Sequence, residues 1–177
     1  MSTSAGSGSP ASLIAEARAG SPDALSALYL EHGGALFRLA YRLTGTSQDA
    51  EDVVHDVFVG LPEALARYEE RGSFAGWLKR VTARVALMRL RARNRRREVA
   101  MEETLPTTDP PPDDASVALR AAVDALPDPL RAVLVLKEVE GYSHAEVGEL
   151  LGISPGASRV RLNRAMRRLR KILEDGR

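Results

Sequence analysis

The side chains best suited to chemistry lie near the C-terminal end of the sequence, and their types are those that contact DNA. Arg159 and Val160 lie beside Asn163 on one side of a predicted helix of about 3.6 residues per turn, and Arg167 extends that side. Arg and Asn can make paired hydrogen bonds to guanine and adenine edges, and Val can contact a thymine methyl group. Arg164 suits a phosphate. This set favours sequence-specific DNA binding over a merely solvated helix face.

The residues around this set predict a helix-turn-helix. Ser143 and Glu146 have the spacing of a capping box, which would start a first short helix. Gly152 can take the left-handed conformation that ends such a helix. Ser154 as N-cap and Pro155 in the first turn would then start a second, basic helix. Two helices joined by a short turn, the second of them basic, are typical of this DNA-binding motif.

Two small residues in the motif are expected to be enclosed. Gly148 falls where the two helices cross closely and only a tiny side chain fits. By helical angle Ser158 faces the buried side and Val160 the exposed side. A buried hydroxyl without a partner would cost about 1 to 3 kcal/mol. We therefore predict that Ser158 bonds a backbone carbonyl one turn back.

A second candidate nucleic-acid surface lies on a predicted helix from Phe74 to about Arg97, which Ser73 would cap. A basic stripe lies about a quarter turn from its apolar stripe and consists of Arg80, Arg84 and Arg91. Trp77 is most simply a core anchor, although an aromatic beside basic residues could also hold unstacked bases. The dense basic run at residues 91–97 favours phosphate contact.

A predicted helix at residues 48–68 begins with an acidic cluster. Its members are Asp49, Glu51, Asp52 and Asp56. Carboxylates stabilise the positive end of a helix dipole, but this explains only one or two of the four. A docking face for a basic partner is the alternative. His55 is expected at the surface rather than on a metal, because a zinc site needs three or four converging ligands and the other histidines are distant in sequence.

The composition excludes several classes of protein. The 177 residues are 44% hydrophobic and 28% charged, as in soluble globular proteins. The absence of cysteine excludes disulfides, thiolate metal sites and thiol catalysis in this chain. Residues 1–9 lack the basic and apolar residues of a signal peptide, and no uncharged apolar run approaches the roughly 20 residues of a membrane span. We expect a cytoplasmic protein without membrane insertion.

The net charge of +1 conceals strong segregation of charge along the chain. Residues 71–97 carry ten basic and no acidic side chains, whereas residues 98–116 carry six acidic and no basic ones. Residues 151–177 are basic again, with eight basic against two acidic side chains. Two basic blocks separated by acidic ones predict two separate contacts with a polyanion.

The same shifts in composition divide the chain. We expect an all-α protein with two small helical domains at residues 21–97 and 117–177. Residues 1–20 would be a flexible tail and the start of a first helix. Residues 98–116 contain Pro106, Pro110, Pro111 and Pro112 with almost no large apolar residue, which predicts a flexible acidic linker.

With both halves laid out, the chain resembles an extracytoplasmic-function (ECF) sigma factor of the sigma-70 family. In the first half the resemblance rests on residues 49–58 (Asp-Ala-Glu-Asp-Val-Val-His-Asp-Val-Phe) and 72–78 (Gly-Ser-Phe-Ala-Gly-Trp-Leu). In the second half it rests on residues 126–134, 141–154, 156–157 and 161–165. The second half alone also resembles the DNA-binding domain of two-component regulators.

The resemblance implies a function in transcription initiation. Its two domains would be sigma region 2 and sigma region 4, and the linker would run through the RNA exit path of the polymerase. The partners would be core RNA polymerase, through the clamp helices of its largest subunit and the flap of its second-largest subunit, and promoter DNA, both duplex and non-template single strand. An anti-sigma factor would be a further partner. The resemblance implies no catalytic residue, cofactor or metal.

The resemblance also assigns site residues to three contacts. Core polymerase would bind Asp49, Asp52, Val53, Asp56 and Val57. The minus-ten element would contact Tyr68, Arg71, Ser73, Trp77, Arg80, Arg84 and Arg91. The minus-thirty-five element would contact Pro155, Ser158, Arg159, Val160, Asn163, Arg164 and Arg167.

Three features of the sequence depart from the family pattern. Arg84 stands where the family usually has Asn, and Met88 where it has Asp, so the minus-ten preference is open. Ser158-Arg159-Val160 replaces the usual order of apolar, basic and small residues, which predicts an altered minus-thirty-five sequence.

Other functions compete with this interpretation. A free-standing helix-turn-helix regulator would bind duplex DNA without polymerase, and the acidic helix would be useless to it. An RNA-binding adaptor would use residues 91–97. A hydrolase or transferase is disfavoured, because the sequence has no phosphate-binding Gly-Lys-Ser/Thr loop, no His-Glu-x-x-His and no serine nucleophile elbow.

Overall fold

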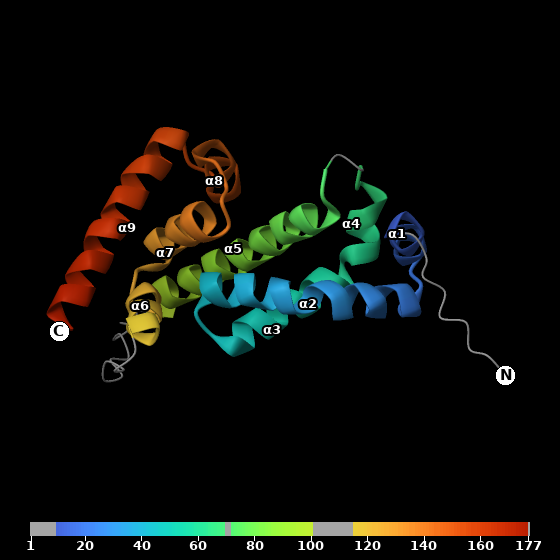
Figure 1. Ribbon diagram of the computed structural model, residues 1–177, viewed down its shortest axis with the longest axis horizontal. Helices are drawn as coiled ribbons and strands as arrows, with labels where there is room; N and C mark the ends of the chain where they lie inside the picture. Colours follow the sequence, from blue (N-terminus) through green and yellow to red (C-terminus); the bar gives the residue numbers. More distant parts are fainter. Residues whose placement is uncertain (1–9, 70–71, 101–114, 177) are drawn as a thin grey trace.

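The computed structural model describes residues 10–69, 72–100 and 115–176, and these residues form helices without strands (Figure 1). The first group of helices comprises α1 (Pro10–Arg18), α2 (Pro22–Thr44), α3 (Ser47–Val59), α4 (Leu61–Ala66) and α5 (Phe74–Ala100). The second comprises α6 (Ala115–Asp124), α7 (Asp128–Leu134), a π-helical turn (Val135–Val139), α8 (His144–Leu151) and α9 (Pro155–Asp175). The expected all-α class is confirmed. No helix among these residues is both long and apolar enough to cross a membrane.

Most of the helix boundaries follow from local chemistry. The Ser21 hydroxyl accepts a hydrogen bond from the Ala24 N–H at the start of α2, as expected of an N-cap. Gly45 ends α2 in the left-handed region at φ 84°. The cap of α3 is Thr46, whose Oγ1 accepts from the Asp49 N–H at 3.2 Å. The sequence predicts Ser47 as this cap, but Ser47 is the first residue of the helix.

Two predicted helices are divided. The expected helix at residues 48–68 ends at Val59 and resumes as α4, because Pro62 lacks an N–H and its ring would clash with the carbonyl four residues back. The apolar pattern of residues 130–140 also predicts one helix, but after Leu134 this helix changes into a π-helical turn. In that turn the Glu140 N–H donates to the Val135 carbonyl at 3.0 Å. This wider turn carries Glu140 toward the first domain. The expected linker lies mostly outside the described residues, with α5 extending to Ala100 before it and α6 starting at Ala115 after it.

The first domain is built on α2, α3 and α5. Its fully buried side chains include Leu36, Leu39, Val53, Leu78 and Ala83. The second domain has a small core of its own between α6, α7 and α9, which contains Ala122, Leu126, Leu134, Ala165 and Leu169. Because helices bury one apolar stripe each, both units are layered helix on helix.

The two domains also share a core, a point that the sequence left open. Val133, Leu136 and Val147 of the second domain are fully buried in the same apolar cluster as the core of the first. Figure 1 shows α7 and α8 lying against α5. The domains therefore pack together in the free protein.

Gly148 sits at the tightest point of the helix-turn-helix, as its position in the sequence suggested. A Cβ added there would lie 2.6 Å from the carbonyl oxygen of Ile153, a backbone atom held by the turn. We expect Gly148→Ala to lower the free energy of unfolding by about 1 to 3 kcal/mol through overpacking. Urea denaturation would measure the loss. Gly156→Ala is the matched control, since its Cβ would meet only the Ser154 hydroxyl at 3.8 Å. Equal effects of the two substitutions would contradict the prediction.

Candidate nucleic-acid interface

The helix-turn-helix forms as its sequence predicted. The Ser143 N–H donates to Glu146 Oε2 at 2.9 Å, and the Glu146 N–H donates to the Ser143 hydroxyl at 3.2 Å, which completes the capping box. Gly152 is left-handed at φ 68° and ends α8. The Ser154 hydroxyl accepts from the Ala157 N–H at 3.1 Å and starts α9.

The capping box also holds the pKa of the Glu146 carboxyl below its ordinary value of 4.5. The main causes are hydrogen bonds from the Ser143 backbone and hydroxyl, with a smaller contribution from Arg80, while burial opposes them. A lowered carboxyl pKa in the folded state stabilises the fold above the unfolded pKa. That stabilisation is lost as the pH falls below about 4.5 and through the folded-state pKa.

The outer face of α9 is open to solvent. Arg159, Asn163, Arg164 and Arg167 are exposed, and Val160 is 50% exposed. None of these arginines forms an ion pair with another part of the chain that the structure describes. Pro155 is exposed in the first turn. An α-helix fits the DNA major groove, so this face can present donors and one apolar contact to base edges.

Ser158 is fully buried, as its helical angle predicted, but its partner differs from the prediction. Its hydroxyl forms a hydrogen bond with Nδ1 of His144 at 2.9 Å rather than with a carbonyl one turn back. The expected carbonyl bond is therefore wrong: α8 crosses α9 so closely that its first residue reaches the hydroxyl. Direct contact between Ser158 and a base is also excluded in this conformation, because the side chain lies between the two helices.

The basic stripe on α5 is largely occupied by the second domain. Arg80 forms an ion pair with Glu146, and its guanidinium lies over the Tyr142 ring, 5.8 Å from the centroid. Arg91 is exposed but donates to the Leu150 carbonyl at 3.0 Å. Arg84 is exposed and forms no hydrogen bond or ion pair with the second domain within the described residues.

An aromatic cluster lies at the start of α5. The rings of Tyr68 and Trp77 are 4.7 Å apart, and Phe74 stacks on Trp77 at 5.6 Å. Tyr68 is buried and Trp77 half-buried, so Tyr68 supports the cluster from inside and cannot offer its ring to a base in this conformation. Ser73 is exposed and caps α5 by accepting from the Gly76 N–H at 3.3 Å. Arg71 lies outside the described residues.

The acidic face of α3 meets arginines of α5. Arg93 pairs with Asp49 at 2.7 Å, and Arg89 pairs with Asp52 at 3.0 Å and with Asp56 at 2.6 Å. Burial lowers the pKa of the Arg89 guanidinium, but the bonds and charges of Asp56 and Asp52 outweigh burial and raise it. The three carboxylates remain partly exposed and thus stabilise the fold without being closed to a partner.

Val53 and Val57, which the resemblance placed in the same polymerase-binding set, require a correction. Both side chains are buried in the core of the first domain. They lie on the inner face of α3, one helical turn apart, while the carboxylates line its edge. In this structure the aspartates of α3 are partly exposed, whereas the two valines are enclosed by the core.

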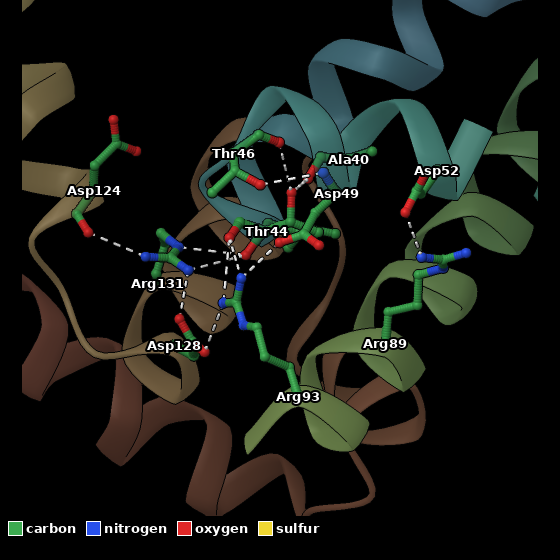
Figure 2. A network of polar contacts seen from close by, with 11 residues as sticks. Ala40, Thr44, Thr46, Asp49, Asp52, Arg89, Arg93, Asp124, Asp128 and Arg131 are labelled. Atoms are coloured by element: carbon green, nitrogen blue, oxygen red, sulfur yellow. Dashed lines mark hydrogen bonds and ion pairs between the residues drawn. The ribbon is translucent and has the colours of Figure 1, made fainter. Parts of the chain in front are cut away.

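A polar network joins the domains around the C-terminal end of α2 (Figure 2). The last carbonyls of a helix lack partners within it and carry negative partial charge. Arg131 of α7 is buried and donates to the Leu43 carbonyl at 3.3 Å, and Arg93 donates to the Thr44 carbonyl at 3.3 Å. Arg93 and Arg131 are in turn both paired with Asp128.

A second polar contact between the domains centres on Glu140. Its side chain is only 5% exposed and accepts from Lys79 at 2.9 Å and from Arg42 at 3.2 Å. Sequence reasoning missed these three residues, since partners 61 and 98 residues apart leave no local signal. The sequence does contain a signal that could have identified Arg131 as a buried charge, because it is the one charged residue in the apolar run from Leu130 to Leu136.

Comparison with known proteins identifies the family of this chain. Residues 28–96 match the family model of sigma-70 region 2, and residues 116–169 match that of sigma-70 region 4. The RNA polymerase sigma factor CarQ of Myxococcus xanthus is 35% identical, over 89% of this chain and 94% of CarQ. The chain belongs to the ECF sigma factors of the sigma-70 family.

Other relatives of this sigma factor agree. The ECF sigma factor SigE of Mycolicibacterium smegmatis is 37% identical over 82% of this chain, which spans 60% of the length of SigE. Among solved structures, CnrH in complex with the cytosolic domain of CnrY is 29% identical at a TM-score of 0.59, with 93% of this chain and 97% of CnrH covered. The sigma factor RpoE, solved with the anti-sigma factor NepR from Bartonella quintana, shares the fold at a TM-score of 0.64 and 20% identity, with 86% of this chain and 98% of RpoE covered.

Proposed function

We propose that this sigma factor binds core RNA polymerase and directs it to promoters whose two elements it reads with its two domains. The observation that carries the proposal is the outer face of α9, where side chains able to contact bases are exposed and form no ion pair with the described residues, while the rest of the motif is packed. Family membership supports transcription initiation as the process. The chain lends specificity to the polymerase and performs no catalysis itself, and the cytoplasm, where the polymerase works, is its compartment.

The helix-turn-helix would read the minus-thirty-five element. Arg159, Asn163 and Arg167 can make paired hydrogen bonds to base edges, and Val160 can contact a thymine methyl group. Arg164, beside this face, would bind a phosphate. Pro155 places the N-terminal end of α9, with its positive partial charge, where a phosphate can approach.

The first domain would read and open the minus-ten element. Arg84 is available on α5 as the chain stands, and the half-buried Trp77 is the nearest aromatic platform for an unstacked base. Arg80 and Arg91 become available only when the second domain leaves, because both are bonded to it. Ser73, the N-cap of α5, and Arg71, which lies outside the described residues, complete the proposed minus-ten set. Minus-ten reading by the whole stripe thus requires the domains to separate.

Core polymerase would dock on the partly exposed carboxylates of α3. Asp49, Asp52 and Asp56 form an acidic edge that a basic helix of the polymerase could meet, with Arg89 and Arg93 yielding part of their ion pairs. We propose the clamp helices of the largest subunit for this face and the flap of the second-largest subunit for the second domain. An anti-sigma factor is the further partner that we propose.

The competing function is a free-standing regulator, and dependence on core polymerase separates the two. Footprinting on a promoter fragment with and without core polymerase is the test. We expect protection of both elements only when core polymerase is present, and co-elution of the chain with it. Tight protection by the chain alone, together with no co-elution, would refute the proposed function.

Arg159 supplies a more local prediction. Arg159→Ala should weaken the holoenzyme on its promoter by about 1 to 3 kcal/mol and relax the preference at one base pair of the upstream element, because a paired hydrogen bond to one base is lost. Competition binding with single-base variants of that element would measure it. A loss of equal size on every variant would mean that Arg159 contacts only phosphate.

A further inference from the structure

A single side-chain hydrogen bond joins α8 to α9 within the described residues, and it lies directly behind the base-reading face. Nδ1 of His144 is 2.9 Å from the hydroxyl oxygen of Ser158. His144 is the first residue of α8, and Ser158 is the fourth of α9. Ser158 is fully buried and His144 half-buried. The bond thus fixes the N-terminal turn of one helix against that of the other.

The other contacts at this crossing are less directional than this hydrogen bond. Gly148 contacts the turn through backbone atoms, which sets how closely the helices approach. The apolar contacts of α9 begin one turn further along it, at Leu162, and continue at Ala165 and Leu169. A serine side chain is short, so its hydroxyl meets the imidazole over a narrow range of helix rotations. At the first turn of α9, the bond between His144 and Ser158 is therefore the contact that depends most on the rotation of the helix.

Rotation of this turn matters because the next two residues face outward. Arg159 and Val160 directly follow Ser158 and are exposed. Binding groups must be held within about 0.5 Å and 10 to 20° of the productive geometry. A small rotation of α9 would therefore change which base edges these two side chains reach.

We propose that His144 is a positioning residue for promoter recognition: its bond to Ser158 sets the rotation of α9 and so selects the bases that Arg159 and Val160 read. The inference rests on the proposed reading of the minus-thirty-five element by this motif. A hydroxyl can donate or accept, and so can the imidazole, so the bond survives whichever ring nitrogen carries the proton.

The opposing explanation is that His144 only satisfies a buried hydroxyl. That function concerns stability alone, since a buried unpaired hydroxyl is costly. Replacing both His144 and Ser158 with apolar residues would then change neither the stability nor the base preference appreciably. The two explanations differ in base preference, which stability does not report.

The experiment compares three variants as holoenzymes with core polymerase, on a promoter library randomised in the upstream element. His144→Asn keeps a polar atom near the position of Nδ1 and should retain the wild-type base ranking. His144→Leu should lower the preference for the best base about tenfold at the positions read by Arg159 and Val160. The double variant His144→Leu with Ser158→Ala should recover the thermal midpoint of unfolding but keep the altered ranking.

The outcomes separate this inference from the proposed function. A double variant that regains the wild-type ranking together with its stability would overturn the inference, as would a His144→Leu variant with an unchanged ranking. If the wild-type holoenzyme itself shows no base preference in this element, the proposed reading of that element falls, and the inference falls with it.

Discussion

Arg131→Met is expected to lower the free energy of unfolding by about 3 to 5 kcal/mol, the usual cost of breaking a buried charged network from one side. Arg131 is 5% exposed, and its guanidinium donates to the carbonyls of Leu43, Asp124 and Leu126 at 3.1 to 3.3 Å, and to Asp128 at 2.5 Å. Methionine fills similar space without a donor. The carbonyls are then left buried without this partner, and the end of α2 loses a cation (Figure 2).

The size of this effect follows from what the arginine joins. Its bonds hold the α6–α7 turn together and connect α7 to α2. Their loss therefore weakens both the fold of the second domain and its packing against the first domain. Domains of this size are stable by only about 5 to 15 kcal/mol. Denaturant unfolding followed by circular dichroism would measure the change, with the exposed Arg120→Met as control. A loss within about 0.5 kcal/mol of the control would contradict this account of the network.

Glu140→Gln is expected to raise the affinity of the free protein for single-stranded minus-ten DNA about tenfold. The closed arrangement occupies Arg80 and Arg91, so DNA must displace the second domain to reach them. The Glu140 carboxylate lies between two cations in this interface, and hydrogen bonds to charged groups contribute about 1.5 to 3 kcal/mol each. Arg42 and Lys79 are about 40% exposed and would regain water, which reduces the net loss to about 1 to 2 kcal/mol. Each 1.4 kcal/mol is tenfold in affinity.

Separation of the domains can be measured directly, because the chain contains no cysteine. Dyes on Ser26→Cys in α2 and Lys171→Cys in α9, two exposed positions, would report the distance between the domains. Glu140→Gln should lengthen it and strengthen DNA binding together. Glu138→Gln is the matched control, two residues away and exposed. Unchanged distance and unchanged affinity in Glu140→Gln would show that the closed arrangement does not restrict DNA access.

The helix-turn-helix was predictable from sequence because its determinants are local. Ser143 with Glu146, and Ser154 with Pro155, act within three residues of each other, and Gly152 acts through its own backbone. Local rules failed where neighbours offered the same chemistry, as with Thr46 and Ser47. They also missed the break at Pro62, although a proline inside an expected helix is a signal for one.

The contacts between the domains were not predictable, because a basic stripe suits a phosphate and a carboxylate equally well. Arg80 is expected to contact DNA, and in this structure it pairs with Glu146, 66 residues further along the chain. The acidic face of α3 was likewise open to two interpretations, and its ion pairs with Arg89 and Arg93 show that it has an internal partner. The burial of Ser158 followed from helical angle, but its partner depended on the crossing of two helices.

Run-off transcription with core polymerase on a library of promoter fragments tests the central claim most directly. We expect transcripts from a subset of fragments that share two elements at fixed spacing. Transcription should depend on this chain, and the preferred upstream element should change in the Arg159→Ala variant. Transcription that is indifferent to the chain, or that is supported equally on every fragment, would contradict the account.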